Sequence, residues 1–277
     1  MSSIEWFQSE SIMIGAGVNR HERLGTLLNL VVEREQLHID EIVAELGVSP
    51  ATVRRDLDTL ADQQLVVRTR GGAAVHPGTG DLPLRYKAAR GGEQKARIAA
   101  AAAAMVSPGH VVGLNGGTTT TEVARELAVT DRLRQHEGPP TTLVTNAVNI
   151  AAELAVRAHL RVVLTGGVVR PLSYELTGPL ADLLLGQISL DLLFLGVNAV
   201  DAELGASAHD EGEAAIGAAL VSRARHVVVV ADAGKLGRSA FARIARPTQV
   251  HALITDDQAD PGVLAGVREA GIEVVVA

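Results

Sequence analysis

The chain has 277 residues, of which 47% are hydrophobic and only 2% aromatic, so a large core has to be built from Ala, Val, Leu and Gly. This length favours two domains. The net charge of −7 excludes a protein that is basic over its whole surface, and the absence of cysteine excludes disulfides and thiolate metal sites.

Residues 1–19 precede the first predicted element. They carry Glu5 and Glu10 where a signal peptide would be basic, and the apolar run 12–18 is far too short to span a membrane. We interpret this segment as a disordered tail or as the product of a start codon assigned too far upstream. No later stretch reaches the apolar length of a transmembrane helix, so we expect no membrane association.

Apolar residues recur every three or four positions in residues 20–35, 39–46 and 49–61, which predicts three amphipathic helices. Ser49 is expected to cap the third helix, with Pro50 in its first turn. The second and third helices are joined by a short turn. This layout is a helix-turn-helix, whose last helix enters the major groove of DNA.

Two adjacent arginines mark the outer face of the third predicted helix. Arg55 lies about 140–200° around the helix from the apolar seam, and Arg54 flanks it. Both suit contacts with DNA in the major groove. The alternative is a solvated helix face on which these arginines form ion pairs with Asp56, Asp58 or Asp62.

Residues 65–75 alternate weakly and predict a β-hairpin wing with its tip at Gly71-Gly72. Arg68 and Arg70 on this wing suit phosphates or the minor groove. Residues 49–76 hold four arginines against three aspartates, a surplus of one positive charge. We therefore expect a homodimer or homotetramer that pools its DNA contacts.

The segment 48–73 resembles the DeoR family of bacterial transcriptional repressors. The family pattern falls on Val48-Ser49, Thr52, Arg54-Arg55-Asp56-Leu57, Arg68 and Gly71-Gly72-Ala73. This chain departs from the pattern at two positions, with Gln64 where the family usually has Gly and Arg70 where it usually has His. The resemblance implies a winged helix-turn-helix domain over 20–76 that binds double-stranded operator DNA. The implied DNA-binding residues are Ser49, Thr52, Arg54, Arg55, Arg68 and Arg70.

Residues 77–92 are rich in Pro, Gly and charge, which predicts an interdomain linker. Two interpretations of this linker stay open. It is either a lever that joins the ligand state to the spacing of the DNA-binding domains, or a plain tether.

From residue 93 to 277, short apolar runs alternate with helical patterns, beginning with an alanine-rich helix at 95–106. This alternation predicts a Rossmann-like α/β domain with a largely parallel sheet and helices on both faces. The expected strands are 111–114, 142–145, 161–165, 192–197, 226–231 and 250–255, with an edge strand at 274–276.

Small or polar residues follow five of these strands. The loop 115–121 combines Asn115, Gly116 and Gly117 with four threonines that begin with Thr118 and Thr119, and it leads into a helix, so its N–H groups suit an anion. Ligands of open α/β sheets bind at the carboxyl ends of strands. We therefore predict a site for a small, polar, phosphorylated molecule. Further residues at strand ends are Thr145, Asn146, Gly166, Gly167, Asn198, Asp232 and Lys235.

Each of these features also has a structural interpretation. The glycine pairs suit tight turns, and Lys235 suits a solvated surface. Asp210 and Glu213 suit the first turn of a helix, where the dipole favours carboxylates. The nine histidines are scattered, with no two within four residues of each other, so we expect no metal site.

The segment 93–256 is similar to the effector-sensing domain of the DeoR family, which shares its fold with ribose-5-phosphate isomerase and glucosamine-6-phosphate deaminase. The resemblance implies binding of a phosphorylated sugar, which weakens operator binding, and no cofactor. Where the family commonly has Asp-Ser, this chain has Asn115-Gly116. The family motifs fall on Gly117-Thr118-Thr119, Thr145-Asn146, Gly166-Gly167, Asp210, Glu213-Ala214, Asp232 and Lys235.

We interpret the chain as a ligand-responsive repressor of carbohydrate-metabolism genes, located in the bacterial cytoplasm and on the nucleoid when bound to DNA. One alternative is a sugar-phosphate isomerase or deaminase in which Lys235, Asp210 and Glu213 supply acid–base chemistry. Another is an architectural DNA-binding protein whose sensor has lost its ligand.

Overall fold

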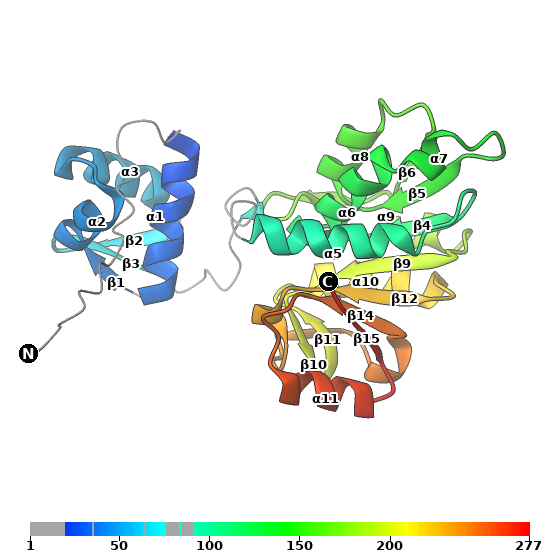
Figure 1. Cartoon of the computed structure of the whole chain (residues 1–277). Helices are drawn as coiled ribbons and strands as arrows, with labels where there is room; N and C mark the ends of the chain where they lie inside the picture. Colours follow the sequence, from blue (N-terminus) through cyan, green and yellow to red (C-terminus); the bar gives the residue numbers. More distant parts are fainter. Residues whose placement is uncertain (1–19, 35, 64, 76–82, 85–90) are drawn as a thin grey trace, which may run out of the picture. The chain divides into compact units, whose positions relative to one another are not determined.

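The computed structural model describes residues 20–34, 36–63, 65–75, 83–84 and 91–277 (Figure 1). The expected tail at 1–19 and most of the expected linker at 77–92 lie outside these residues. Two compact units divide the chain, residues 1–89 and 90–277. Within the described ranges, every helix is too short or too polar to cross a membrane.

The first unit is a winged helix-turn-helix. Its three strands form an antiparallel sheet in the order β1-β3-β2, and the helices pack on a core of leucine, isoleucine and valine side chains. The three expected helices are confirmed. The elements are α1 Arg20–Arg34, β1 Gln36–His38, α2 Ile39–Leu46, α3 Pro50–Asp62, β2 Val66–Thr69 and β3 Gly72–Val75.

Local sequence explains the tight turn between α2 and α3. Gly47 ends α2 in the left-handed conformation, with φ of 63°, which glycine adopts without steric cost. Ser49 is the N-cap of α3, and Pro50 occupies its first position. On the inner face of α3, Val53 and Leu57 are fully buried, so the opposite face is left for solvent or a ligand.

The expected β-hairpin wing with a glycine tip is confirmed, with Gly71 in the turn. The turn is formed by Arg70 and Gly71, whose φ is 90°, and Gly72 is already paired in β3. Gly72 lies against β1, where any side chain would collide with the carbonyl oxygen of Leu37. The strand β1 was not predicted from the sequence, and it is what makes this glycine necessary.

The second unit, described without a gap from 91 to 277, contains a seven-stranded sheet in the order β15-β14-β12-β9-β4-β5-β6. All of its strand pairs are parallel, and every expected strand is present, with ends shifted by at most two residues. The strands are β4 Val111–Leu114, β5 Thr141–Thr145, β6 Leu160–Leu164, β9 Leu192–Gly196, β12 Val227–Val230, β14 Ala252–Thr255 and β15 Glu273–Val276.

Helices cover both faces of this sheet, as expected, and α5 crosses one face in Figure 1. The faces are built by alternation along the strands. Phe194 and Val228 point to the core shared with α5, α6 and α8, whereas Leu193 and Val229 point to the core shared with α9, α10 and α11. The helices are α5 Gly92–Ala104, α6 Thr118–Val129, α7 Asp131–Arg134, α8 Val148–Leu154, α9 Leu180–Leu185, α10 Glu211–Arg223 and α11 Pro261–Glu269.

Two small antiparallel sheets and two single-turn helices lie outside the main sheet, and the sequence patterns did not predict them. The sheets pair β7 with β8 and β11 with both β10 and β13. These elements are β7 Val168–Arg170, β8 Glu175–Thr177, β10 Ala199–Asp201, β11 Gly205–Ala208, β13 Ala242–Ala245, η1 Ala233–Lys235 and η2 Pro247–Gln249.

The strand order places a topological switch point between β4 and β9. From β4 the chain adds β5 and β6 on one side, then crosses back to add β9 and β12 on the other. Loops that follow the two central strands therefore diverge and leave room for a ligand at the carboxyl edge. The loop 115–121 follows β4, so it lies at this point.

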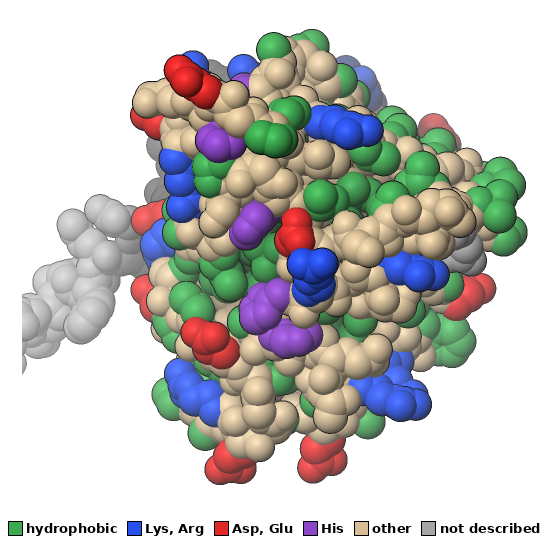
Figure 2. Space-filling view, turned by 90° about the vertical axis from the view of Figure 1, so that its right-hand side faces the viewer, with side chains coloured by type: hydrophobic (Ala, Val, Ile, Leu, Met, Phe, Trp, Pro, Cys, Tyr) green, Lys and Arg blue, Asp and Glu red, His purple; other side chains and the backbone are tan. Residues whose placement is uncertain are grey.

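At the opposite, amino edge of the sheet, histidines precede two strands. The ring of His226 lies 4.7 Å from the ring of His251, measured between centroids, and Val227 N donates to His251 Nδ1 at 3.1 Å. Figure 2 looks onto this edge and shows histidine side chains gathered beside basic and acidic ones. Burial and the neighbouring His251 lower the pKa of His226, while Glu273 opposes this shift.

This pair predicts a pH-dependent stability. Because the pKa of His226 is lower in the folded chain than in the unfolded chain, the unfolded state takes up more protons as the pH falls below about 6.5. The free energy of unfolding should therefore decrease between about pH 7 and about pH 5, and His226→Gln should make the decrease shallower. Urea unfolding followed by circular dichroism measures both slopes. The exposed His136→Gln serves as the control, and identical slopes in wild type and His226→Gln would contradict the assignment.

Candidate functional site

The amino end of α3 is held by its cap. Thr52 N donates to Ser49 Oγ at 3.2 Å, and the two hydroxyl oxygens lie 2.9 Å apart. Arg54 and Arg55 follow on the exposed face, where Arg55 Nε donates to the carbonyl oxygen of Ala51 at 3.3 Å. The guanidinium of Arg55 therefore lies back along the helix toward the same capped end.

The three aspartates of α3 leave the two arginines unpaired. Asp56 faces the core, only 2% exposed, and accepts from Arg23 Nε at 2.6 Å and from Arg23 Nη2 at 3.3 Å. This hydrogen bond raises the pKa of Arg23. Among the described residues, no carboxylate lies within 4.0 Å of the guanidinium of Arg54 or Arg55. The ion-paired alternative for this arginine pair is therefore wrong in this structure.

The wing is tied to α3 by one of its own arginines. Arg68 Nε lies 3.1 Å from Asp58 Oδ1, and Arg68 Nη1 donates to the carbonyl oxygen of Gly72 at 3.1 Å. Arg70 stands exposed in the turn between β2 and β3. Of the two expected phosphate contacts on the wing, Arg70 is thus open, whereas Arg68 already has intramolecular partners.

At the switch point of the second unit, Asn115 joins two strand ends. Its Nδ2 donates to the carbonyl oxygen of Gly196 at 2.9 Å, and its Oδ1 accepts from Gly196 N at 2.7 Å. Asn115 is 6% exposed. Its amide is therefore occupied in linking β4 to β9, and the expected contact of this side chain with a ligand is not available in this arrangement.

The threonines of the loop are also turned inward. Thr120 Oγ1 and Thr121 Oγ1 donate to the carbonyl oxygen of Gly117 at 3.1 and 2.6 Å, and Thr119 is 2% exposed. Gly117 and Thr118 remain half-buried at the start of the twelve-residue helix α6. What the loop offers to a ligand is thus the N–H groups of its first helical turn, at the positive end of the dipole.

A buried carboxylate completes this corner. Glu175 on β8 is 3% exposed, and its Oε2 accepts from Asn146 Nδ2 at 3.0 Å. Its carboxylate packs directly on Gly116, where any side chain would collide with it. Gly116 and Asn146, both expected site residues, are therefore brought together by a residue that the sequence reading missed.

A second missed residue links two expected acidic side chains. Arg170 on β7 contacts Asp210 Oδ2 through Nε at 3.1 Å and Glu213 Oε1 through Nη1 at 2.9 Å. Asp210 also caps α10, because its Oδ1 accepts from Glu213 N at 2.9 Å. The helix-start interpretation of these carboxylates is thus correct, and they also form a charged cluster with Arg170.

The remaining expected residues have structural partners or lie apart. Thr145 Oγ1 accepts from Ala147 N at 3.0 Å, and Gly167, with φ of 138°, allows close contact with Thr177 while Gly166 before it is exposed. Lys235 Nζ lies 3.9 Å from Asp232 Oδ2. Lys235 follows β12, two strands from β4, so about 10 Å separates the two strand ends.

Two family models match these units. The DeoR-like helix-turn-helix domain matches residues 23–77, and the DeoR C terminal sensor domain matches residues 91–257. The chain belongs to the DeoR family. The family resemblance first seen in the residues of α3 and the wing thus holds for both units of this DeoR-family protein.

Relatives match this DeoR-family chain over most of their length. The HTH-type transcriptional regulator GlpR of Haloferax volcanii is 35% identical over 255 residues, covering 92% of this chain and 96% of that protein. The glycerol-3-phosphate regulon repressor of Escherichia coli K12 is 32% identical over 235 residues, covering 85% and 90%. Both are named as regulators, so the chain is a DNA-binding transcriptional regulator, and the isomerase alternative is not supported.

A solved structure of an enzyme matches the chain only weakly. Ribose 5-phosphate isomerase A of Methanocaldococcus jannaschii superposes with a TM-score of 0.38 at 21% identity, covering 52% of this chain and 54% of that one. Similarity at this level establishes neither a common function nor a common site.

The buried pair in the helix-turn-helix of this DeoR-family regulator predicts a stability effect. Asp56→Ala leaves the guanidinium of Arg23 without this partner, which should destabilise the first unit by about 1.5–3 kcal/mol. Asp58→Ala removes an exposed partner and should cost less than about 1 kcal/mol. Hydrogen exchange of α1 and α3 in the full chain measures both effects. Equal protection in the two variants would show that the Arg23–Asp56 pair does not stabilise this unit.

Proposed function

We propose that this regulator represses carbohydrate-metabolism genes and leaves its operator when a phosphorylated sugar binds the second unit. The observation that carries the DNA-binding part is the capped helix α3, which presents Arg54 and Arg55 without an ion pair among the described residues. We assign residues 20–76 to DNA binding, 77–92 to the linker and 93–277 to effector sensing. The protein acts in the bacterial cytoplasm.

On DNA, α3 enters the major groove with its capped end first. Arg55 and Thr52 contact base edges there, because both lie at this end of the exposed face. Ser49 fixes the helix start beside the groove. Arg54 and Arg70 contact phosphates. Arg68 also contacts a phosphate, through those N–H groups of its guanidinium that do not bond to Asp58 or Gly72.

The regulator binds DNA as a homodimer or homotetramer, with half-sites about 10–10.5 bp apart or a multiple of this spacing. One such domain carries too small a charge surplus to hold DNA tightly. Exposed apolar side chains support contact between copies: on β7, Val168 is 70% exposed next to the exposed Val169, and on α9, Leu183 is 72% exposed with the exposed Leu180 three residues before it. Side chains of this kind mark protein contacts when they lie together.

The effector binds at the carboxyl edge of the sheet. Its phosphate accepts from the N–H groups of Gly117, Thr118 and Thr119 at the start of α6. Carboxylates outnumber cations around this edge: there are four carboxylates, Glu175, Asp210, Glu213 and Asp232, and two cations, Arg170 and Lys235. The carboxylates suit the hydroxyl groups of a sugar, and Lys235 supplies a positive charge for its phosphate. The effector favours a conformation that fits the operator poorly.

Substitution of Arg55, which we propose contacts base edges, tests the DNA interface. Arg55→Ala should weaken operator binding by at least about tenfold while the fold is retained, as expected for loss of a specific base contact. Arg34→Ala, which removes an exposed arginine paired with Glu45 on α2, is the matched control and should bind nearly as well as wild type. Mobility-shift titration measures both. Normal operator affinity in Arg55→Ala would remove this residue from the interface.

The effector is tested with a panel of phosphorylated sugars and sugar alcohols that includes glycerol 3-phosphate, the compound in the name of one relative. One member should raise the melting temperature and release the operator at the same concentrations. In Lys235→Gln, the effector concentration needed for operator release should rise by at least about tenfold. In Arg268→Gln, which removes the same charge from an exposed position on α11, this concentration should stay as in wild type. If no member shifts the melting temperature, the sensing role is contradicted and the architectural alternative gains support.

A further inference from the structure

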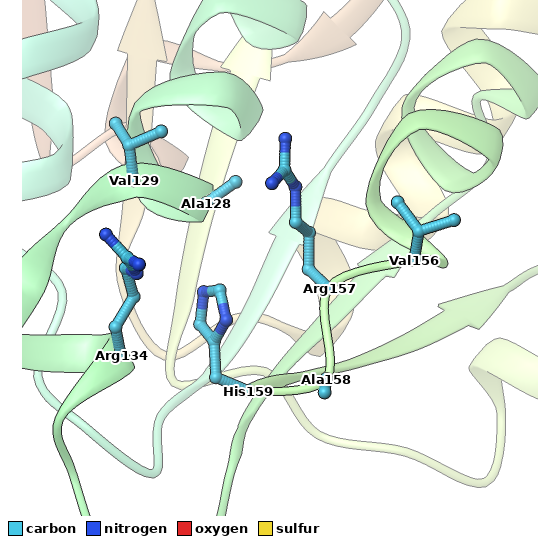
Figure 3. Close-up of a pocket in the computed structure, with 7 residues that line it drawn as sticks. All are labelled: Ala128, Val129, Arg134, Val156, Arg157, Ala158 and His159. Atoms are coloured by element: carbon cyan, nitrogen blue, oxygen red, sulfur yellow. The ribbon is translucent and has the colours of Figure 1, made fainter.

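A cavity of about 290 Å³ lies far from the carboxyl edge, where β6 begins (Figure 3). Three segments form it: the end of α6, the short helix α7 and the turn between α8 and β6. Its functional side chains are Arg134, Arg157 and His159, with Val129 and Val156 beside them.

The polar lining of this cavity is cationic. Figure 3 shows Arg134 and Arg157 on either side of His159, and no carboxylate is among the lining residues. Within the described ranges, Arg157 has no carboxylate within 4.0 Å. Arg134 lies 3.6 Å from Asp131, but both side chains are more than half exposed, so this pair is worth less than about 1 kcal/mol.

One lining atom lacks the partner that its burial requires. His159 Nε2 is buried and has no hydrogen-bond partner among the described residues. A buried imidazole nitrogen without a partner costs free energy, which an oxyanion in the cavity would recover by accepting from it once the ring has rotated toward the cavity. After that rotation, this nitrogen and the two guanidinium groups give three donors around one space.

The apolar part of the lining is also open to solvent. Val129 is 55% exposed and Val156 is 80% exposed, and they flank the cationic groups. A purely inorganic ion would leave both valines in water. A ligand with a short hydrocarbon group attached to its anionic head would cover them.

The cavity is separate from the proposed effector site. The helix α6 runs from one to the other, since it starts at Thr118 in the loop after β4 and ends at Val129 in the cavity. Twelve helical residues span about 18 Å. The carboxyl end of a helix carries about half a negative charge, which opposes an anion, but two guanidinium charges exceed it.

We propose that this cavity binds a small organic anion, with a phosphate or carboxylate head between Arg134 and Arg157 that also accepts from His159 Nε2. The hydrocarbon part of the ligand packs on Val129 and Val156. Phosphate and carboxylate heads share this chemistry, and probes of both kinds separate them.

The test is calorimetric titration of the full chain with n-butyl phosphate, pentanoate and inorganic phosphate. We expect saturable binding of at least one alkyl probe, with inorganic phosphate weaker because it leaves the valines uncovered. Arg134→Gln/Arg157→Gln should weaken that binding by at least about tenfold, since charge-assisted hydrogen bonds to the head are lost. Arg223→Gln/Arg268→Gln removes the same charge from two exposed arginines on α10 and α11 and should bind as wild type does.

Three results would overturn the proposal: no binding of any probe by wild type, equal weakening in the two double variants, or equal affinity for inorganic phosphate and n-butyl phosphate. The effector site is distinguished by Lys235→Gln, which should leave binding of the alkyl probe unchanged. Loss of this binding in Lys235→Gln, with retention in Arg134→Gln/Arg157→Gln, would place the ligand at the carboxyl edge of the sheet instead.

Discussion

The paired hydrogen bonds between the Asn115 amide and the backbone of Gly196 hold the carboxyl ends of β4 and β9 at a fixed separation. These are the two strands at which the sheet changes direction, so their loops would otherwise diverge without a tie. Gly116 and Gly117 follow at once, and their position decides where α6 starts. The candidate anion site at the first turn of α6 therefore depends on an amide whose Nδ2 and Oδ1 both bond to the backbone of Gly196.

That tie also organises the charged groups nearby. Because Gly116 has no side chain, the carboxylate of Glu175 can pack on the loop and hold Asn146 at the end of β5. Three strand ends are thereby connected through side chains buried from water. The charge-assisted hydrogen bond from Asn146 to Glu175 is the strong one, whereas Asn146 Oδ1 is buried and has no hydrogen-bond partner among the described residues.

The pattern of apolar residues was enough to predict the helices of the first unit and every strand of the large sheet, because those helices repeat apolar residues every three or four positions and those strands are mostly apolar runs. The three-residue strands β1, β7, β8 and β10 are too short for a pattern, so they were missed. Arg170 and Glu175 were missed for a different reason. Their partners lie 29 to 43 residues away, and only the folded chain brings them together. Asp56 was named only in the alternative interpretation, as an ion-pair partner of Arg54 and Arg55, whereas helix geometry turns it toward Arg23.

The contact between Gly72 and Leu37 limits how the first unit can respond to DNA. With β1, β3 and β2 in one hydrogen-bonded sheet, and α2 beginning directly after β1, the hairpin cannot swing while the helix pair stays still. The three-stranded sheet and the helix α2 are therefore linked by continuous backbone hydrogen bonds, including one from Ile39 N to the carbonyl oxygen of Gly71. Fitting to an operator of different curvature is then left to side chains such as Arg70 and to the DNA, whose own bending would carry part of the sequence preference.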